Sequence, residues 1–325
     1  MKKTVKAGIL GGALFAAASA VFAGQQFNLF AERKGKRGSH PILPSGTPAA
    51  DDERQKMLEH LNTYPVETLC VTSGEGFCLE GYLYRVKPSN DRVIIAFHGY
   101  HSSAQRGMGW FAPMYEESGC DFLLINERSH ETSEGRYITF GVREREDGLL
   151  WVSKILEIYG KDVKIFLHGV SMGAATVMMM AAHPELPENV KGIAEDCGYD
   201  NMEREYAFLM RKYPALAVRY GTFLMNAAGK CLSGAALYEA DVEREVKKAK
   251  IPALMIHGTE DKMVPFEALC RLTDAYAGPH EIFFVPGAAH AKAHAKAKEE
   301  YEKRFVRFVQ KTFETGENRV LSERQ

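Results

Sequence analysis

The sequence predicts an α/β fold, in which a mostly parallel central sheet is covered by helices on both faces. Six short apolar runs of β-type composition recur along the chain, at residues 93–97, 122–125, 163–167, 192–194, 253–256 and 282–285. Segments with helical patterning separate most of these runs, at about residues 104–117, 141–159, 172–182, 264–276 and 290–313. Short apolar strands that alternate with helices are typical of a parallel sheet that is buried on both faces.

The composition is that of an ordinary globular protein. The 325 residues are 46% hydrophobic and 26% charged, and the net charge of −1 gives no basic excess that would favour nucleic-acid binding. The six cysteines form no C-x-x-C pair and have no zinc-ligand spacing, so we expect no metal site. Most of the cysteines lie in apolar runs, where we expect buried free thiols.

The first thirty residues have the pattern of a targeting segment. Three lysines among the first six residues precede an apolar run over residues 7–23. This run is near the lower limit for a membrane-spanning helix and slightly long for the core of a signal peptide. Ala23 before Gly24 fits a cleavage site, so residues 1–30 are predicted to be a cleaved signal peptide or an uncleaved membrane anchor outside the fold. Either alternative favours a folded domain that is secreted or membrane-anchored, outside the cytoplasm.

The folded domain is predicted to begin near residue 51. Residues 31–50 have the composition of a linker, basic at first and then rich in proline, glycine and serine. A short helix is expected over residues 51–62. The runs at 66–71 and 77–84 flank a Ser-Gly-Glu-Gly sequence, which predicts a β-hairpin. The domain is predicted to continue to residue 313, and residues 314–325 are predicted to be a polar tail.

One long insertion interrupts the alternation of strands and helices. It separates the run that ends near Glu195 from the run that begins at Pro252, and it contains apolar-striped segments such as those at 208–210 and 223–225. In this architecture an insertion of this kind covers the face at the carboxyl ends of the parallel strands. Residues from about 198 to 250 are therefore predicted to form a small helical lid.

The motif with the clearest chemistry lies between a predicted strand and a predicted helix. The turn reads Gly169-Val170-Ser171-Met172-Gly173, which fits the G-x-S-x-G pattern of a nucleophile elbow. Glycines are needed on either side of the serine because Cβ atoms would collide in so tight a turn. Ser171 is the predicted nucleophile. The backbone N–H of Met172, at the helix N-terminus, is a predicted oxyanion donor.

A serine nucleophile also needs a base and an acid that orients the base. Asp261 follows the run at 253–256, and His290 follows the run at 282–285. Both therefore lie at carboxyl ends of predicted parallel strands, where catalytic groups gather. We predict that His290 is the base and Asp261 the acid.

Alternatives exist for both of these roles. Asp196 also follows a strand end and is the rival acid, and Glu260 is a possible substitute for its neighbour Asp261. His294 lies one turn beyond His290, and we expect it on a helix surface rather than beside the nucleophile. His290 and His294 have the i,i+4 spacing of a zinc pair, but the glutamate that such a site needs is missing between them.

The second oxyanion donor is predicted to be the backbone N–H of Tyr100. It lies in the loop His98-Gly99-Tyr100-His101, directly after the run at 93–97. Gly99 allows the backbone to approach the reacting carbonyl closely. His98 is expected to hold this loop by hydrogen bonds, whereas His101, His130 and His168 are expected to be structural.

Together these features resemble the α/β-hydrolase superfamily, and more narrowly the bacterial serine hydrolases with a serine-aminopeptidase-type or acylesterase-like domain and an N-terminal hydrophobic anchor. The resemblance runs from about Val66 to Phe313. It rests on residues 98–100, 126–130, 133–141, 169–173 and 195–198, and on Asp261 and His290. Glu131 stands where the family pattern usually has glycine. The resemblance implies hydrolysis of a small-molecule ester or amide through an acyl-enzyme, with no metal or organic cofactor.

The predicted substrates are carboxyl esters with short or medium acyl chains. The readable side chains of the lid are apolar and suit an acyl group: Leu209, Met210, Leu216, Phe223, Leu224 and Met225. An aminopeptidase or a thioesterase on the same triad is the alternative, and a non-catalytic binding module is the second. An aminopeptidase would need a carboxylate for the substrate amine. Glu203 and Glu205 are candidates, but we expect both to face solvent.

Overall fold

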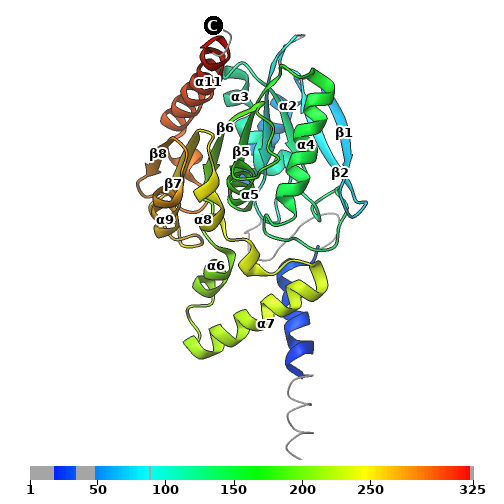
Figure 1. The fold of residues 1–325 in the computed structure, drawn as a ribbon, viewed down its shortest axis with the longest axis vertical. Helices are drawn as coiled ribbons and strands as arrows, with labels where there is room; N and C mark the ends of the chain where they lie inside the picture. Colours follow the sequence, from blue (N-terminus) through cyan, green and yellow to red (C-terminus); the bar gives the residue numbers. More distant parts are fainter. Residues whose placement is uncertain (1–17, 34–47, 88, 323–325) are drawn as a thin grey trace, which may run out of the picture.

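The computed structural model describes residues 18–33, 48–87 and 89–322 (Figure 1). Its eight strands form one sheet in the order β1-β2-β4-β3-β5-β6-β7-β8. Only the β1–β2 and β2–β4 pairs are antiparallel, and the strands from β4 across to β8 pair in parallel. The predicted mostly parallel sheet is confirmed. The strands are β1 (Val66–Thr72), β2 (Cys78–Tyr84), β3 (Arg92–Phe97), β4 (Asp121–Ile125), β5 (Lys164–Val170), β6 (Val190–Asp196), β7 (Ala253–Gly258) and β8 (His280–Val285).

Helices cover both faces of the sheet. The longer helices are α2 (Pro48–Leu61), α3 (Ala112–Glu117), α4 (Glu144–Tyr159), α5 (Met172–Ala181), α6 (Met202–Leu209), α7 (Ala215–Ser233), α9 (Glu267–Ala275) and α11 (Lys298–Ser322). The shorter ones are η1 (Ala104–Met108), η2 (Gly109–Phe111), η3 (Leu237–Glu239), α8 (Val242–Glu245), η4 (Val246–Lys248) and α10 (Ala293–Lys296). One core cluster joins the sheet to α4, α5, α8 and α9, and the other joins it to α2, α3 and α11.

Burial explains why the inner strands carry unbroken apolar runs. Every residue of β4 and β7 is buried, and so is all of β3 after Arg92. A strand that is covered on both faces has no solvent side on which polar residues would alternate. These inner strands therefore expose almost no side chain along their length.

The edge of the sheet differs from expectation at the cysteines. The predicted hairpin is confirmed by the antiparallel pair β1 and β2. A disulfide joins Cys70 to Cys78 in this hairpin, where free thiols were expected. Of the free cysteines, Cys120 and Cys197 are buried as expected, whereas the other two, at positions 231 and 270, are exposed.

Two helical predictions need adjustment. The helix expected over 104–117 is a π turn, a 3₁₀ turn and the short helix α3, and the helix expected over 290–313 is divided into α10 and α11. Helix α11 continues to Ser322, so helical backbone extends into the segment predicted to be a polar tail. Phe305 and Phe313 lie on the buried stripe of α11, which packs against the sheet.

The insertion between β6 and β7 consists of two parts. Helices α6 and α7 extend away from one end of the sheet (Figure 1). In contrast, Val242 of α8 and Val246 of η4 are buried in the core beside α5 and α9. Within the segment predicted to form a lid, only α6 and α7 therefore extend beyond the body of the domain.

The prediction that residues 1–30 lie outside the fold is wrong for the part that the structure describes. Residues 18–31 are helical, and Phe27 and Ala31 are buried in the core. The ring of Phe27 lies 5.6 Å from that of Tyr137, and the N–H of Ile138 donates to the carbonyl of Ala31. The helix at the end of this N-terminal segment therefore supplies core side chains, in Phe27 and Ala31. Residues 1–17 and most of the predicted linker lie outside the described residues. Among the described residues, no helix has the length and hydropathy needed to cross a membrane.

Replacing Phe27 with alanine should lower the free energy of unfolding by about 3 kcal/mol, because a buried ring is lost and a cavity remains. Phe22, in the same helix, is 56% exposed, and its replacement by alanine should change that free energy by about 0.5 kcal/mol or less. Urea denaturation of the full-length protein measures both values. Equal effects of the two substitutions would show that residues 18–31 do not contribute to the core.

Candidate active site

Ser171 lies at the junction of β5 and α5 in strained backbone. Its φ of 58° and ψ of −114° fall where non-glycine residues are rare. Its N–H donates to the carbonyl oxygen of Asp196 at 2.8 Å, which ties the turn to the neighbouring strand β6. Strain of this kind persists only where the surrounding structure fixes it, and it is characteristic of functional sites.

The two glycines of the turn allow α5 to begin directly against the sheet. A Cβ on Gly169 would lie 2.2 Å from the carbonyl oxygen of Gly173, and a Cβ on Gly173 would lie 2.2 Å from that of Phe97. The sequence predicted that glycine is required here. The collisions, however, would involve the backbone of α5 and β3 rather than Ser171 itself. The position of the serine is thus fixed by close packing of main chain against main chain.

His290 joins the serine to an aspartate. Its Nε2 lies 2.9 Å from the Oγ of Ser171, and its Nδ1 lies 2.7 Å from the Oδ2 of Asp261. Because a carboxylate can only accept, Nδ1 carries the proton and Nε2 is left to accept the proton of the serine hydroxyl. Both distances are within the reach that general-base catalysis requires.

Asp261 is held in place from its other side. Its Oδ1 accepts the backbone N–H groups of Met263 at 2.8 Å and Val264 at 2.9 Å. The side chain is fully buried, so these bonds replace water around the carboxylate. Since the loop after β7 fixes one oxygen, the other oxygen is oriented toward His290.

The rival residues lie elsewhere. Asp196 is buried and accepts from the hydroxyl of Tyr301 at 3.2 Å, and burial raises its pKa to about 7. Glu260 is exposed. His294 pairs with Glu302, their Nε2 and Oε1 atoms 2.9 Å apart. In the described part of the chain, no side-chain hydrogen bond joins any of these three rivals to Ser171 or His290; Asp196 meets Ser171 only through its backbone carbonyl.

The loop after β3 lies against the serine. A Cβ on Gly99 would be 3.3 Å from the Cβ of Ser171, so only glycine allows this approach without displacement. The predicted role of His98 is confirmed: its Nδ1 donates to the carbonyl of Gly99 at 2.8 Å, and its Nε2 accepts the N–H of Glu127 at 3.1 Å. Burial lowers the pKa of His98 and keeps the ring neutral, as an accepting Nε2 requires.

The other histidines near strand ends are structural, as expected. The Nε2 of His130 accepts the N–H of His101 at 3.1 Å, and burial lowers the pKa of His130 to about 4. His168 is buried between Tyr115 and Tyr301, and burial lowers its pKa to about 3. Both rings are therefore neutral at physiological pH, and they connect their neighbours by hydrogen bonds without adding charge.

Phe30 is a residue near the site that sequence reasoning missed. Its ring lies 5.9 Å from that of Tyr100, and the hydroxyl of Tyr100 donates to its carbonyl oxygen. The signal was present, because Ala23, Phe27, Phe30 and Ala31 follow the i, i+4, i+7, i+8 spacing of a buried helix face. The targeting interpretation of this run concealed that pattern.

The segment predicted to be a lid differs from expectation in two ways. Leu216 and Phe223, predicted to suit an acyl group, are 79% and 66% exposed. Conversely, Glu205 was expected to face solvent and is buried, whereas Glu203 accepts a hydrogen bond from the side-chain amide of Asn226 at 2.7 Å. Helix α6 is oriented so that the carboxyl group of Glu205, as well as apolar side chains, faces the body of the domain.

One group among the described residues combines three potential metal ligands at short range, namely Cys197, Asp261 and His290. The Nδ1 of His290 and the Oδ2 of Asp261 already bond to each other, and burial keeps the pKa of the Cys197 thiol far above its usual value. A metal ion here would need the thiolate and would break the bond that orients His290. The group is better suited to proton transfer than to metal binding.

Comparison with known proteins is consistent with this arrangement. A family model described as the prolyl oligopeptidase family matches residues 137–316, which is more than half of the chain. An uncharacterized protein of Bacillus subtilis (strain 168), YqkD, is 22% identical over 265 residues, covering 79% of this chain and 84% of that protein.

Solved structures of esterases have the same fold. The Pyrococcus furiosus esterase Pf2001 superposes with a TM-score of 0.61 at 20% identity, covering 83% of this chain and 97% of the other. Est1E from Butyrivibrio proteoclasticus, solved with ferulic acid bound, gives a TM-score of 0.56 at 18% identity and covers 75% of this chain and 99% of the other. The fold is thus the α/β-hydrolase fold that the sequence predicted.

Replacing Asp261 with asparagine should lower kcat by about 10⁴-fold, because the amide would no longer hold the proton on Nδ1 of His290. Replacing Asp196 with asparagine should cost far less, since no hydrogen bond connects its side chain to His290. Rates on one ester substrate compare the two variants. A larger loss at Asp196 would assign the acid to that residue instead.

Proposed function

The chain belongs to the prolyl oligopeptidase family, and from this we propose that it is a serine hydrolase that cleaves carboxyl esters through an acyl-enzyme. The observation that carries the proposal is the hydrogen-bonded series from Asp261 through His290 to Ser171. In this proposal Ser171 is the nucleophile, His290 the base and Asp261 the orienting acid.

The proposed mechanism uses these three side chains and two backbone donors. As the Oγ of Ser171 attacks the carbonyl carbon, its proton passes to Nε2 of His290, and Asp261 stabilises the resulting imidazolium. The N–H groups of Met172 and Tyr100 bind the oxyanion. His290 then protonates the leaving oxygen, and later removes a proton from the water that cleaves the acyl-enzyme. No step requires a metal or an organic cofactor.

Carboxyl esters are the proposed substrates, and the similar structures named as esterases support them. Amide cleavage by an aminopeptidase is the second candidate, and the burial of Glu205 favours it, because a substrate amine needs a carboxylate partner. A thioesterase would use the same groups with a different leaving atom. A non-catalytic binding module is less consistent with a complete hydrogen-bonded triad.

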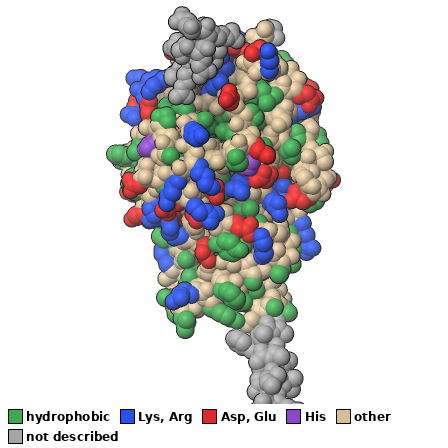
Figure 2. Space-filling view, viewed as in Figure 1, with side chains coloured by type: hydrophobic (Ala, Val, Ile, Leu, Met, Phe, Trp, Pro, Cys, Tyr) green, Lys and Arg blue, Asp and Glu red, His purple; other side chains and the backbone are tan. Residues whose placement is uncertain are grey.

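We also propose that the catalytic domain lies outside the cytoplasm, secreted or held at a membrane by its N-terminal segment. The disulfide between Cys70 and Cys78 supports an oxidising compartment. Residues 209–235 hold four basic residues and no carboxylate, and Leu216 and Phe223 of α7 are exposed. Figure 2 shows hydrophobic side chains on the lower end of the molecule, where α7 lies. Such a surface is suited to anionic lipid.

Replacing Ser171 with alanine should reduce ester hydrolysis to background and abolish labelling by a fluorophosphonate probe, because the hydroxyl is the atom that forms the covalent bond. Ser153, an exposed serine on α4, provides the control, and its replacement by alanine should leave both readouts unchanged. Labelling that survives in the Ser171 variant would place the nucleophile elsewhere.

The ester preference is tested by specificity constants. Values of kcat/KM for p-nitrophenyl esters should rise with acyl length until the pocket is full, by up to about fourfold per methylene if each contributes about 0.8 kcal/mol. They should exceed those for aminoacyl p-nitroanilides. A clear preference for the anilides would instead support the aminopeptidase alternative.

A further inference from the structure

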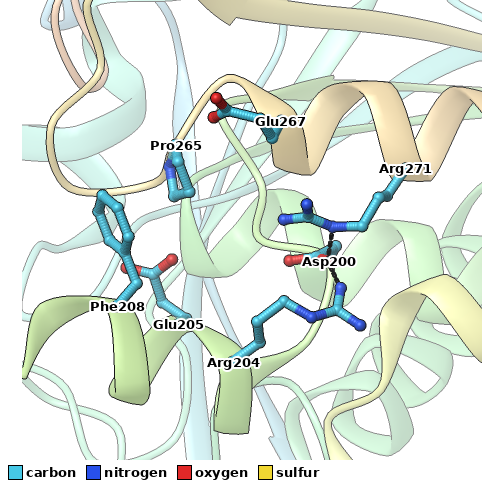
Figure 3. Close-up of a pocket in the computed structure, with 7 residues that line it drawn as sticks. All are labelled: Asp200, Arg204, Glu205, Phe208, Pro265, Glu267 and Arg271. Atoms are coloured by element: carbon cyan, nitrogen blue, oxygen red, sulfur yellow. Dashed lines mark hydrogen bonds and ion pairs between the residues drawn. The ribbon is translucent and has the colours of Figure 1, made fainter. Parts of the chain in front are cut away.

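A cavity lies between the lid helix α6 and the start of α9 (Figure 3). Its volume is about 300 Å³, and it is lined by Asp200, Arg204, Glu205, Phe208, Pro265, Glu267 and Arg271. Pro265 directly follows Val264, whose N–H binds the side chain of Asp261. The loop that holds the proposed catalytic acid therefore also forms one wall of the cavity.

The arginines of the cavity already have partners. Asp200 pairs with both Arg204 and Arg271, and the Nε of Arg271 lies 2.5 Å from its Oδ2. Arg204 also contacts Glu243 at 3.0 Å. In Figure 3 both guanidinium groups turn toward Asp200. This end of the cavity is consequently close to electrical balance.

Glu205 at the other end has no such partner. It is only 5% exposed, and its buried Oε1 accepts no hydrogen bond from any described residue. Figure 3 shows its carboxyl group beside Phe208 and Pro265, on the side away from Asp200. A buried carboxyl without a partner costs about 1–3 kcal/mol or more, and a hydrophobic side chain would fill the same space without that cost. A ligand that donates hydrogen bonds to the Glu205 carboxyl group would remove this cost.

We propose that this cavity binds a positively charged amine of the substrate, with Glu205 accepting its N–H groups and Phe208 and Pro265 contacting the adjoining apolar part. The inference rests on the proposed hydrolase function and narrows its substrates to esters or amides that carry an ammonium group. An anionic ligand fits poorly, because both arginines are paired and Glu205 would repel it.

The charges around Glu205 balance one another, so its own carboxylate is the group that favours a cation. The carboxylates that face Glu205 are Asp200 and Glu267 in the cavity and Asp261 behind the loop, and the cations are Arg204, Arg271 and Arg211. Burial, assisted by the charge of Asp261, raises the pKa of Glu205 to about 8. Below that pH the empty site holds a neutral carboxyl. An arriving ammonium group displaces this proton to solvent, so affinity should rise with pH and level off above about pH 8.

Direct binding tests the site without relying on turnover. Benzylammonium chloride is titrated calorimetrically into the full-length Ser171→Ala variant at pH 6, 7 and 8, with benzyl alcohol as the neutral analogue. Affinity for benzylammonium should increase about tenfold from pH 6 to pH 7 and less from pH 7 to pH 8, and benzyl alcohol should show no such trend.

Adding Glu205→Gln should weaken benzylammonium binding at pH 8 at least tenfold and remove its pH dependence, the expected effect of losing a charged hydrogen bond. Adding Glu205→Asp, which keeps the charge, should have an intermediate effect. Glu203→Gln is the matched control, because Glu203 lies on the same helix but bonds to Asn226, and it should change neither quantity. Equal binding in the Glu205→Gln variant, or none in the parent, would overturn the proposal.

The hydrolysis of two matched esters provides a second test of the amine site. The kcat/KM of p-nitrophenyl 6-aminohexanoate is divided by that of p-nitrophenyl heptanoate, in which a methyl group replaces the ammonium group. This ratio should exceed one in the native protein, fall at least tenfold in Glu205→Gln and stay constant in Glu203→Gln. Hydrolysis of both esters at equal rates would refute the amine site and leave the hydrolase intact. Binding of benzylammonium without hydrolysis of any ester would support the amine site and refute the proposed hydrolase function.

Discussion

The strained backbone at Ser171 is the constraint on which the site depends. Its φ of 58° is maintained because α5 starts in main-chain contact with β3 and β5, and no side chain larger than glycine fits at positions 169 and 173. The hydroxyl proposed as the nucleophile is therefore positioned by packed backbone rather than by flexible side chains. Every other group of the site then has to reach it from the end of a neighbouring strand, and the loops after β3, β7 and β8 do so.

The loop after β3 is held by groups that stay neutral. His98 and His130 each use one ring nitrogen as a donor and the other as an acceptor, and burial lowers both pKa values. A neutral ring that bonds at both nitrogens fixes a loop without adding charge near the proposed oxyanion site. Negative charge close to Ser171 is instead concentrated on Asp261, where two backbone N–H groups and His290 compensate it.

Most of the fold could be predicted from the sequence because its signals are local. Unbroken apolar runs marked the buried strands, and the chain order together with the strand-end rule placed Ser171, Asp261 and His290 near one another; their catalytic roles stay predictions. The predictions that failed are those that depend on tertiary contacts. The run before Gly24 has the composition of a targeting segment, and nothing local reveals that Phe27 meets Tyr137. Likewise, nothing local reveals that Glu205 is buried where α6 faces the loop that contains Pro265.

The two failed predictions, on the N-terminal segment and on the exposure of Glu205, are connected through Phe30. Its ring lies 5.9 Å from that of Tyr100, which carries the proposed oxyanion donor, and 5.7 Å from that of Tyr206. Tyr206 is the neighbour of Glu205 on α6. The helix over residues 18–31 thus supports both the loop that would bind the oxyanion and the helix that would bind the substrate amine. Because these contacts share one aromatic ring, changes at Phe30, Tyr100 and Tyr206 should not be energetically additive. The N-terminal helix is then part of the architecture of the site, whatever else the segment before it does.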